Sequence, residues 1–246
     1  MENRPLIFVT NDDSYLSKGF RKIVELAREF GDVIAIAPDR VQSGMSQAIQ
    51  FTHPMEIVSC DTGMGVVAYS VDSTPADCVR FGLDGLKEKF DLILSGINRG
   101  VNLGADIVYS GTVGAILEAG RHGIPAIALS TYPDTLDKAV GELPRVFDFI
   151  RENKLLDVCT LYNVNIPPAP RGIRITRQGS PYFSDEFIRL SDSSYQQTGS
   201  ILTDRNPTDT TLDTVSVAEG YVSITPVACT RTDHRAFEEL TCLSDK

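Results

Sequence analysis

The feature that most constrains the fold is a β-α-β pattern within the first forty residues. Leu6 to Thr10 is a short run of mostly branched apolar side chains, which is typical of a buried parallel strand. Apolar residues then recur at helical spacing from Gly19 to Phe30, and Gly31 stops the run. A second apolar run, Val33 to Ala37, ends at Pro38. Strands joined by a helix in this way pair in parallel through a right-handed crossover, so the segment predicts an α/β fold.

The same alternation of elements continues to about residue 130. Thr74 followed by Pro75 and Asp77 is a typical helix start. The expected elements are a β-hairpin within Ser46 to Tyr69, helices at Ala76 to Lys89 and Thr112 to Ala119, and strands at Asp91 to Ser95 and Pro125 to Ser130.

The second half of the chain is richer in Pro, Thr and Asp, which favours mixed or antiparallel strands. We expect a helix at Leu143 to Leu156 and strands at Leu161 to Ile166, Gly172 to Thr176 and Tyr221 to Val227. Since no linker separates the halves, the prediction is one domain over residues 1–246. It has a three-layer Rossmann-like core at about 5–160 with a mostly parallel sheet, and a mixed or antiparallel β extension at about 161–246.

Composition limits the partners of this chain. Of its 246 residues 42% are hydrophobic, which suffices for a core without disulfides, and the formal net charge is -10. So acidic a chain lacks the positive field that binds long nucleic acid, although a local site can still hold a small phosphorylated ligand. No apolar stretch reaches bilayer length, the start does not resemble a signal peptide, and the five cysteines are scattered. We therefore expect a cytoplasmic protein without a membrane partner.

Polar side chains follow the first three predicted strands. Asp12 and Asp13 come after the first strand, Ser43 after the second and Asn98 after the third. The carboxyl ends of parallel strands open onto one crevice, where two neighbouring carboxylates repel each other unless a cation neutralises them. An all-oxygen set suits Mg²⁺ or Mn²⁺. An exposed acidic turn, a turn serine and an Asx-turn asparagine are the alternatives when each residue is taken alone.

A second group of polar residues precedes a predicted helix. Ser110, Gly111 and Thr112 offer hydroxyls and backbone amides at a positive helix end, which favours an anion, although an ordinary helix cap needs the same residue types. Further candidates for contacts to phosphate or substrate are Asn11, Gly44 and Arg99. The aromatic residues of Pro181 to Phe187 either cover a ligand or form a packing or dimer surface.

Six blocks in a fixed order resemble the SurE survival-protein phosphatases. They are TNDD, APDRVQSG, DSTPADCV, SGINRGVNLGADIVYSGTVGA, NVNIP and GYVSITP, and they span residues 8 to about 227. The resemblance implies a cytoplasmic, Mg²⁺- or Mn²⁺-dependent 5'/3'-nucleotidase that forms a dimer or tetramer by C-terminal exchange. It places one metal ion per subunit on Asp12, Asp13, Ser43 and Asn98. The residue after the carboxylate pair is usually glycine in the family and is Ser14 here.

The working hypothesis is hydrolysis of a nucleoside monophosphate by water that the bound cation activates, with Asp12 orienting the water. Two alternatives stay open. One is a phosphatase that forms an aspartyl phosphate, and the other is a regulator that binds a nucleotide without turning it over.

Overall fold

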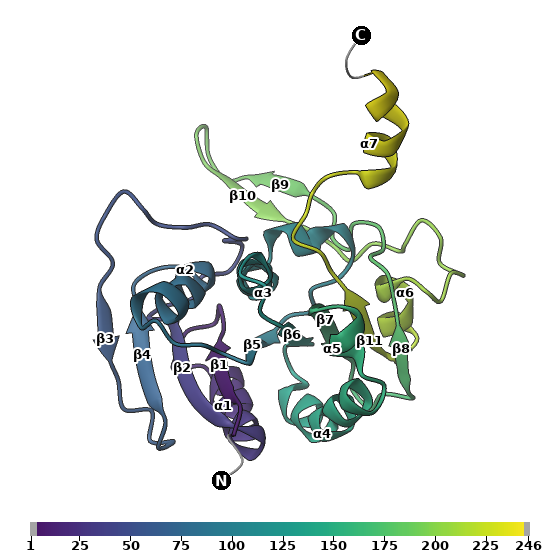
Figure 1. The fold of residues 1–246 in the computed structure, drawn as a ribbon. Helices are drawn as coiled ribbons and strands as arrows, with labels where there is room; N and C mark the ends of the chain where they lie inside the picture. Colours follow the sequence, from purple (N-terminus) through teal and green to yellow (C-terminus); the bar gives the residue numbers. More distant parts are fainter. Residues whose placement is uncertain (1–3, 244–246) are drawn as a thin grey trace.

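A computed structural model describes residues 4–243 and shows an α/β fold with one large sheet (Figure 1). The nine strands of this sheet are β1 (Leu6–Thr10), β2 (Asp32–Pro38), β3 (Ile57–Ser59), β4 (Val67–Val71), β5 (Leu92–Arg99), β6 (Ala126–Thr131), β7 (Leu161–Ile166), β8 (Ile173–Ile175) and β11 (Val222–Pro226). Their order is β3-β4-β2-β1-β5-β6-β7-β11-β8. The strands from β4 to β7 in this order run parallel, which confirms the predicted mostly parallel sheet.

The remaining strands extend this sheet at both edges. β3 pairs antiparallel with β4, as the expected hairpin requires. β11 pairs antiparallel with β7, and β8 lies parallel to β11 at the other edge. The C-terminal strands therefore continue the sheet of the N-terminal half.

Helices cover both faces of the sheet and bury its apolar side chains. One face packs against α1 (Lys18–Phe30) and α4 (Leu136–Glu152), which is followed by the short α5 (Leu155–Val158). The other face packs against α2 (Pro75–Arg80) and α3 (Gly111–Arg121). The resulting core contains two clusters of buried side chains, one on each side of the sheet.

Two predicted helix boundaries were wrong. The helix expected at Ala76 to Lys89 consists of α2 and a π-helical turn at Phe81–Gly85, which closes when the Leu86 amide donates to the Phe81 carbonyl. Lys87 then adopts a φ of 60°, which ends the helical path. The helix expected at Leu143 to Leu156 begins earlier, at Leu136, and ends earlier, at Glu152, with Pro144 inside it.

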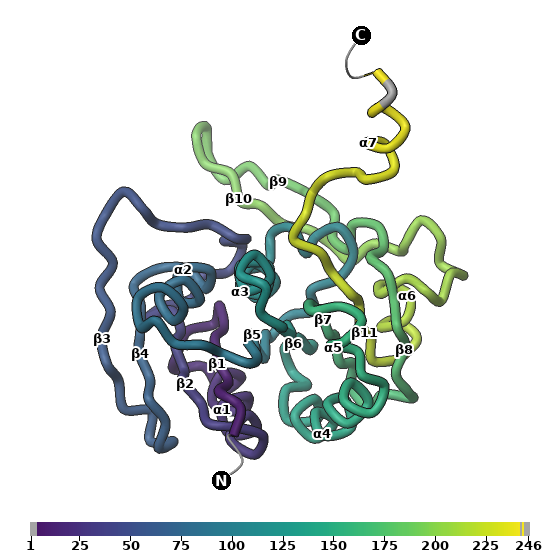
Figure 2. The backbone as a smooth tube through the Cα atoms, viewed as in Figure 1, coloured from purple at the N-terminus to yellow at the C-terminus, as the bar shows by residue number. Residues whose placement is uncertain are grey.

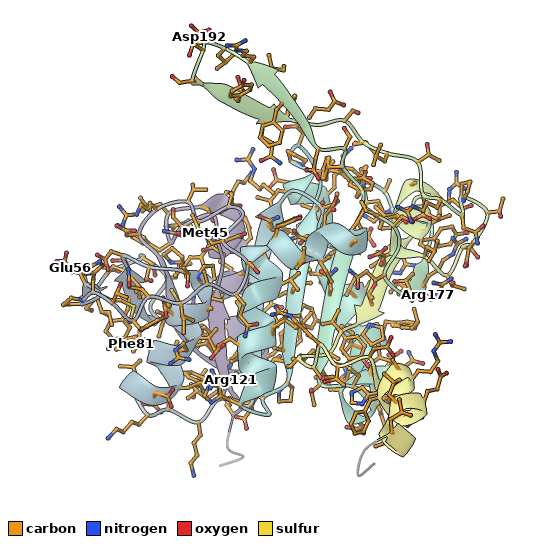
Figure 3. The ribbon with its side chains drawn as sticks, turned by 90° about the horizontal axis from the view of Figure 1, so that it is seen from above. Met45, Glu56, Phe81, Arg121, Arg177 and Asp192 are labelled. Atoms are coloured by element: carbon orange, nitrogen blue, oxygen red, sulfur yellow. The ribbon has the colours of Figure 1, made fainter. Side chains whose placement is uncertain are left out.

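A second, two-stranded sheet stands away from the body of the molecule. It consists of β9 (Glu186–Arg189) and β10 (Tyr195–Thr198), which pair with each other and not with the large sheet. Figure 3 shows Asp192 at the outer tip of this hairpin. Farther along the chain, α6 (Asp213–Ala218) packs on β11, whereas α7 (His234–Leu240) projects from the body (Figure 2). Within residues 4–243 no helix is long and apolar enough to cross a membrane.

The sheet has a switch point that positions a ligand crevice. From β1 the chain adds β2 and β4 on one side, and β5, β6 and β7 on the other. The connections on the two sides leave in opposite directions, so a crevice opens beyond the carboxyl ends of β1 and β5. Asp12 follows β1, and Asn98 lies near the end of β5.

Candidate functional site

A cavity of about 850 Å³ lies beyond these strand ends and brings most of the predicted site residues together. Its wall contains seven of them: Asp12, Asp13, Ser43, Gly44, Asn98, Arg99 and Ser110. The other three, Asn11, Gly111 and Thr112, do not line it. They are buried directly behind the wall.

Asp12 is the buried carboxylate of the site, with 4% of its surface exposed. Its Oδ1 accepts a hydrogen bond of 2.7 Å from the Thr112 hydroxyl. Burial, together with the neighbouring Asp13 carboxylate and against the hydrogen bond from Thr112, raises the pKa of Asp12 to about 6. Among the ion pairs of residues 4–243, none involves Asp12 or Asp13. A cation in the cavity would neutralise this pair.

The other predicted ligands supply oxygen atoms around the same space. Oδ2 of Asp13 accepts a long hydrogen bond of 3.3 Å from the Arg99 amide. Nδ2 of Asn98 donates to the Gly100 carbonyl at 2.7 Å, which fixes the side-chain amide and leaves its oxygen as the remaining donor atom for a ligand. The loop that carries Ser43 is held to the end of β1, because the backbone amide of Gln42 donates a hydrogen bond of 2.8 Å to the backbone carbonyl of Asp12.

This donor set fits a hard divalent cation. It comprises two carboxylates, an amide oxygen and a hydroxyl, and such all-oxygen sets suit Mg²⁺ or Mn²⁺. In the part of the chain that the structure describes, no group of three or more His, Cys, Asp or Glu side chains is placed to hold a metal ion. A cation here therefore depends on the neutral oxygens of Ser43 and Asn98 as well as on the two carboxylates.

Asn11 shapes the turn that presents the two carboxylates. Its Nδ2 donates to the Ser14 carbonyl at 3.0 Å and to the Ser17 hydroxyl at 2.8 Å. Ser17 in turn caps α1 by accepting from the Phe20 amide. Ser14 adopts a φ of 83°, a region that favours glycine, and this explains why glycine is expected at this position.

The start of α3 packs against Asp12. Ser110 is the N-cap of α3, and its hydroxyl accepts a hydrogen bond of 3.1 Å from the Val113 amide. Ser110 also lines the cavity. Gly111 lies so near that a Cβ on it would be 3.2 Å from Oδ2 of Asp12. Gly111 and Thr112 thus support Asp12 from behind, and only Ser110 of the predicted anion cradle lines the cavity.

The cavity wall is acidic. Asp12, Asp13, Asp106 and Asp185 line it, and Arg99 is the one cationic side chain among the described lining residues. A phosphate dianion would be repelled by such a surface unless further positive charge were bound there. The wall therefore needs a cation before it can hold a phosphorylated ligand.

The rest of the cavity wall comes from residues that were not among the predicted metal or phosphate contacts. It includes Asp106, Tyr109 and Gln197, together with Phe183 and Phe187 from the aromatic segment noted in the sequence. Asp106 lies inside the long glycine-rich block, but no local pattern distinguishes it from its neighbours. The hairpin residues come from a segment in which none of the six motif blocks lies.

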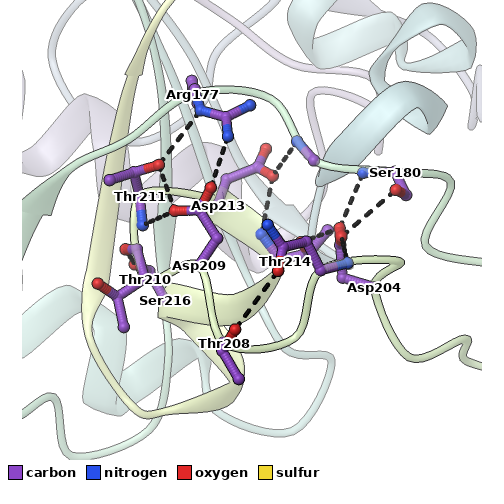
Figure 4. Close-up of polar contacts among 12 residues, drawn as sticks. Arg177, Ser180, Asp204, Thr208, Asp209, Thr210, Thr211, Asp213, Thr214 and Ser216 are labelled. Atoms are coloured by element: carbon purple, nitrogen blue, oxygen red, sulfur yellow. Dashed lines mark hydrogen bonds and ion pairs between the residues drawn. The ribbon is translucent and has the colours of Figure 1, made fainter.

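Two aspartates, Asp204 and Asp213, join this wall to the loop that follows β5. Figure 4 shows both of them with Ser180 and Thr214. Asp213 accepts from the amides of Gly104 and Gly179, at 3.0 and 2.8 Å. Asp204 accepts from the Ser180 amide at 2.8 Å and from the Thr214 hydroxyl at 2.7 Å. These bonds hold the segment before Phe183 beside Gly104. They therefore fix the position of the Phe183 wall relative to the loop that follows β5.

Comparison with known proteins agrees with this architecture. Residues 7–185 match the family described as Survival protein SurE. The chain is 36% identical to a protein from Christiangramia forsetii named 5'-nucleotidase SurE, with 99% of this chain and 98% of that protein covered. A Legionella pneumophila protein of the same name is 34% identical, with 96% of each covered. The crystal structure of the SurE protein from Aquifex aeolicus matches with a TM-score of 0.82 at 32% identity, over 98% of this chain and 100% of that one. This chain belongs to the SurE family.

Proposed function

We propose that this protein hydrolyses nucleoside 5'-monophosphates to nucleosides and phosphate, with 3'-monophosphates as alternative substrates. The relatives named 5'-nucleotidase SurE match nearly the whole chain and support the activity. The cavity supports it as well, since its 850 Å³ lies within the range of about 300 to 1,000 Å³ that is usual for pockets that bind small molecules.

The reaction depends on one divalent cation per chain, Mg²⁺ or Mn²⁺, held by Asp12, Asp13, Ser43 and Asn98. The observation that carries this proposal is the buried carboxylate of Asp12 in an acidic cavity, where it forms no ion pair with any residue that the structure describes. When bound, the cation lowers the pKa of water and neutralises charge on the phosphoryl group.

The side chains of this protein have separate tasks in the hydrolysis. Thr112 occupies Oδ1 of Asp12, which leaves Oδ2 to orient the attacking water and accept its proton. Ser110 and Arg99 bind phosphoryl oxygens from the cavity wall. A bond forms between the water oxygen and phosphorus, the ester bond to the nucleoside breaks, and the nucleoside oxygen takes up a proton from solvent as Asp12 returns the one it accepted.

The experiment is phosphate release from a panel of nucleoside monophosphates with Mg²⁺, Mn²⁺ or EDTA. Wild-type protein is compared with Asp12→Asn, and with Asp137→Asn as a control that removes an exposed carboxylate on α4. We expect release that needs the cation and is lost only in Asp12→Asn. Tight nucleotide binding without release would favour the regulator instead, and a phosphorylated Asp12 trapped during turnover would favour the covalent route.

The proposal includes a homodimer or homotetramer in the cytoplasm. α7 has no buried residue, and its Phe237 and Leu240 are exposed. A helix of this length is unstable alone, so packing against a second chain would account for it. The cysteine side chains that the structure describes are free thiols, which supports a reducing compartment.

A further inference from the structure

We propose that the wall formed by Phe183 and Phe187 is a nucleobase subsite, with Phe183 as the stacking surface and Phe187 as the outer wall. This inference rests on the proposed nucleotidase function. It adds the residues that separate a nucleotide from other phosphate esters.

Phe183 is held in place before any ligand binds. Its backbone amide and that of Tyr182 both donate to Oδ2 of Asp106 at 2.8 Å. Its ring meets the Tyr182 ring edge to face, with 4.9 Å between centroids, and Tyr182 is buried beside Leu103 and Val217. The Phe183 side chain nevertheless stays 45% exposed and lines the cavity. A fixed and exposed aromatic face loses little conformational entropy when a flat ligand stacks on it.

The hairpin supplies the second aromatic side chain. Phe187 of β9 lies directly opposite Gln197 of β10, so both side chains point to the same face of the hairpin. Both line the cavity, and Phe187 is 66% exposed. The next residue, Ile188, is on the opposite face and does not line the cavity. The hairpin thus presents an aromatic ring and an amide to the cavity side.

The chemistry of the two ends of the cavity identifies the occupant. Asp12, Asp13 and Arg99 form a charged end suited to a metal-bound phosphate. The other end offers phenyl rings and the amide of Gln197, whose Nε2 donates to Asp185 at 3.2 Å. A flat heteroaromatic ring with polar edges matches this end, because it stacks on phenyl rings and exchanges hydrogen bonds with an amide. In a nucleoside monophosphate the nucleobase is that ring.

The test compares adenosine 5'-monophosphate with ribose 5-phosphate, which lacks only the base. We expect the wild-type protein to prefer the nucleotide in kcat/KM, and Phe183→Leu and Phe187→Ala each to reduce this preference by roughly tenfold. The reduction should come from a higher KM for the nucleotide. Ile188→Ala is the matched control on the other face of β9 and should keep the wild-type preference.

Three outcomes would overturn the proposal. The first is an unchanged preference in both Phe variants. The second is an equal loss in Ile188→Ala. The third is a change in molecular mass of Phe187→Ala in solution with an unaltered preference, which would assign the ring to contact with a second copy of the chain. If no phosphate ester is hydrolysed at all, the nucleotidase function fails. The subsite is then judged by calorimetric binding of adenosine 5'-monophosphate, which must weaken in both Phe variants.

Discussion

The Thr112 hydroxyl donates a hydrogen bond of 2.7 Å to Oδ1 of Asp12 across 100 residues of sequence. Thr112 belongs to the first turn of α3, and Asp12 follows β1. Both side chains are buried, so this bond restricts the rotation of the Asp12 carboxylate beside the cavity. It links the helix that covers one face of the sheet to the proposed metal site.

Replacing Thr112 with valine keeps the shape of the side chain and removes this bond. We expect a ten- to 100-fold loss of metal affinity and of kcat/KM, the range typical of lost partners behind metal ligands. Metal titration of phosphate release checks both quantities. Thr176→Val is the control, since Thr176 is a buried threonine bonded to Ser223 and Thr225. Equal losses of activity in the two variants would contradict a specific role for Thr112.

Without metal, Asp12 should destabilise the protein near neutral pH. Its pKa of about 6 in the folded state lies above the ordinary value of 3.8. Between these values the folded state holds a proton that the unfolded state has lost, so stability falls as pH rises from about 4 to 6. The full effect at pH 7 is on the order of 3 kcal/mol.

Asp12→Asn should therefore be more stable than wild type in EDTA at pH 7, although inactive. Urea unfolding at pH 4.5 and 7 measures this, and the gap between the two proteins should shrink at the lower pH. Adding Mn²⁺ should stabilise wild type much more than the variant. If Asp12→Asn were less stable than wild type in EDTA at pH 7, burial of the charged Asp12 carboxylate would not destabilise the wild-type protein.

Gly111 provides the close approach of α3 to Asp12. In Gly111→Ala the new Cβ would lie 3.1 Å from Cβ of Asp12 and 3.3 Å from the Gln42 carbonyl oxygen, so the strand end and its neighbouring loop must shift. We expect activity to fall at least tenfold. In Gly141→Ala, within α4, the new Cβ meets no atom of the described residues within 4 Å, so this variant should gain about 0.5 to 1 kcal/mol of stability with normal activity. Unchanged turnover by Gly111→Ala would show that the close approach of α3 to Asp12 is not required for activity.

Ser14→Gly should stabilise the turn that carries the carboxylates. A φ of 83° costs a residue with a side chain roughly 1 to 2 kcal/mol, partly offset by the greater freedom of glycine when unfolded. The net gain is expected to be below about 1.5 kcal/mol and is measurable by thermal unfolding. Ser17→Gly, which removes the cap of α1, should be destabilising instead. A loss of stability in Ser14→Gly would mean that its side chain contributes more than its backbone costs.

The parallel strands of the sheet, and the polar residues at their carboxyl ends, could be predicted from the sequence. Buried parallel strands are continuous apolar runs, and the polar residues after them share one edge by topology, which is why Asp12, Ser43 and Asn98 could be grouped. Helix boundaries were harder, because the turn after α2 and Pro144 within α4 depend on packing and not on local preference.

The roles behind the site could not be predicted from residue type. A hydroxyl at a helix start can bind the phosphate of a ligand or a carboxylate of the protein itself. Only the fold shows that the Thr112 hydroxyl binds the Asp12 carboxylate. The far wall was also missed in part, because Asp106 acts through its bonds to the backbone amides of Tyr182 and Phe183, residues distant in sequence.

The most direct test of the account is a Mn²⁺ titration of single-turnover phosphate release from a nucleoside monophosphate, with bound Mn²⁺ counted by electron paramagnetic resonance. Wild-type protein should bind one Mn²⁺ per chain, and release should rise in parallel with that binding. In Asp13→Asn both curves should shift together to higher concentrations. Full release in EDTA, or loss of Mn²⁺ binding in Asp13→Asn without loss of release, would contradict a cation held by this acidic edge of the sheet.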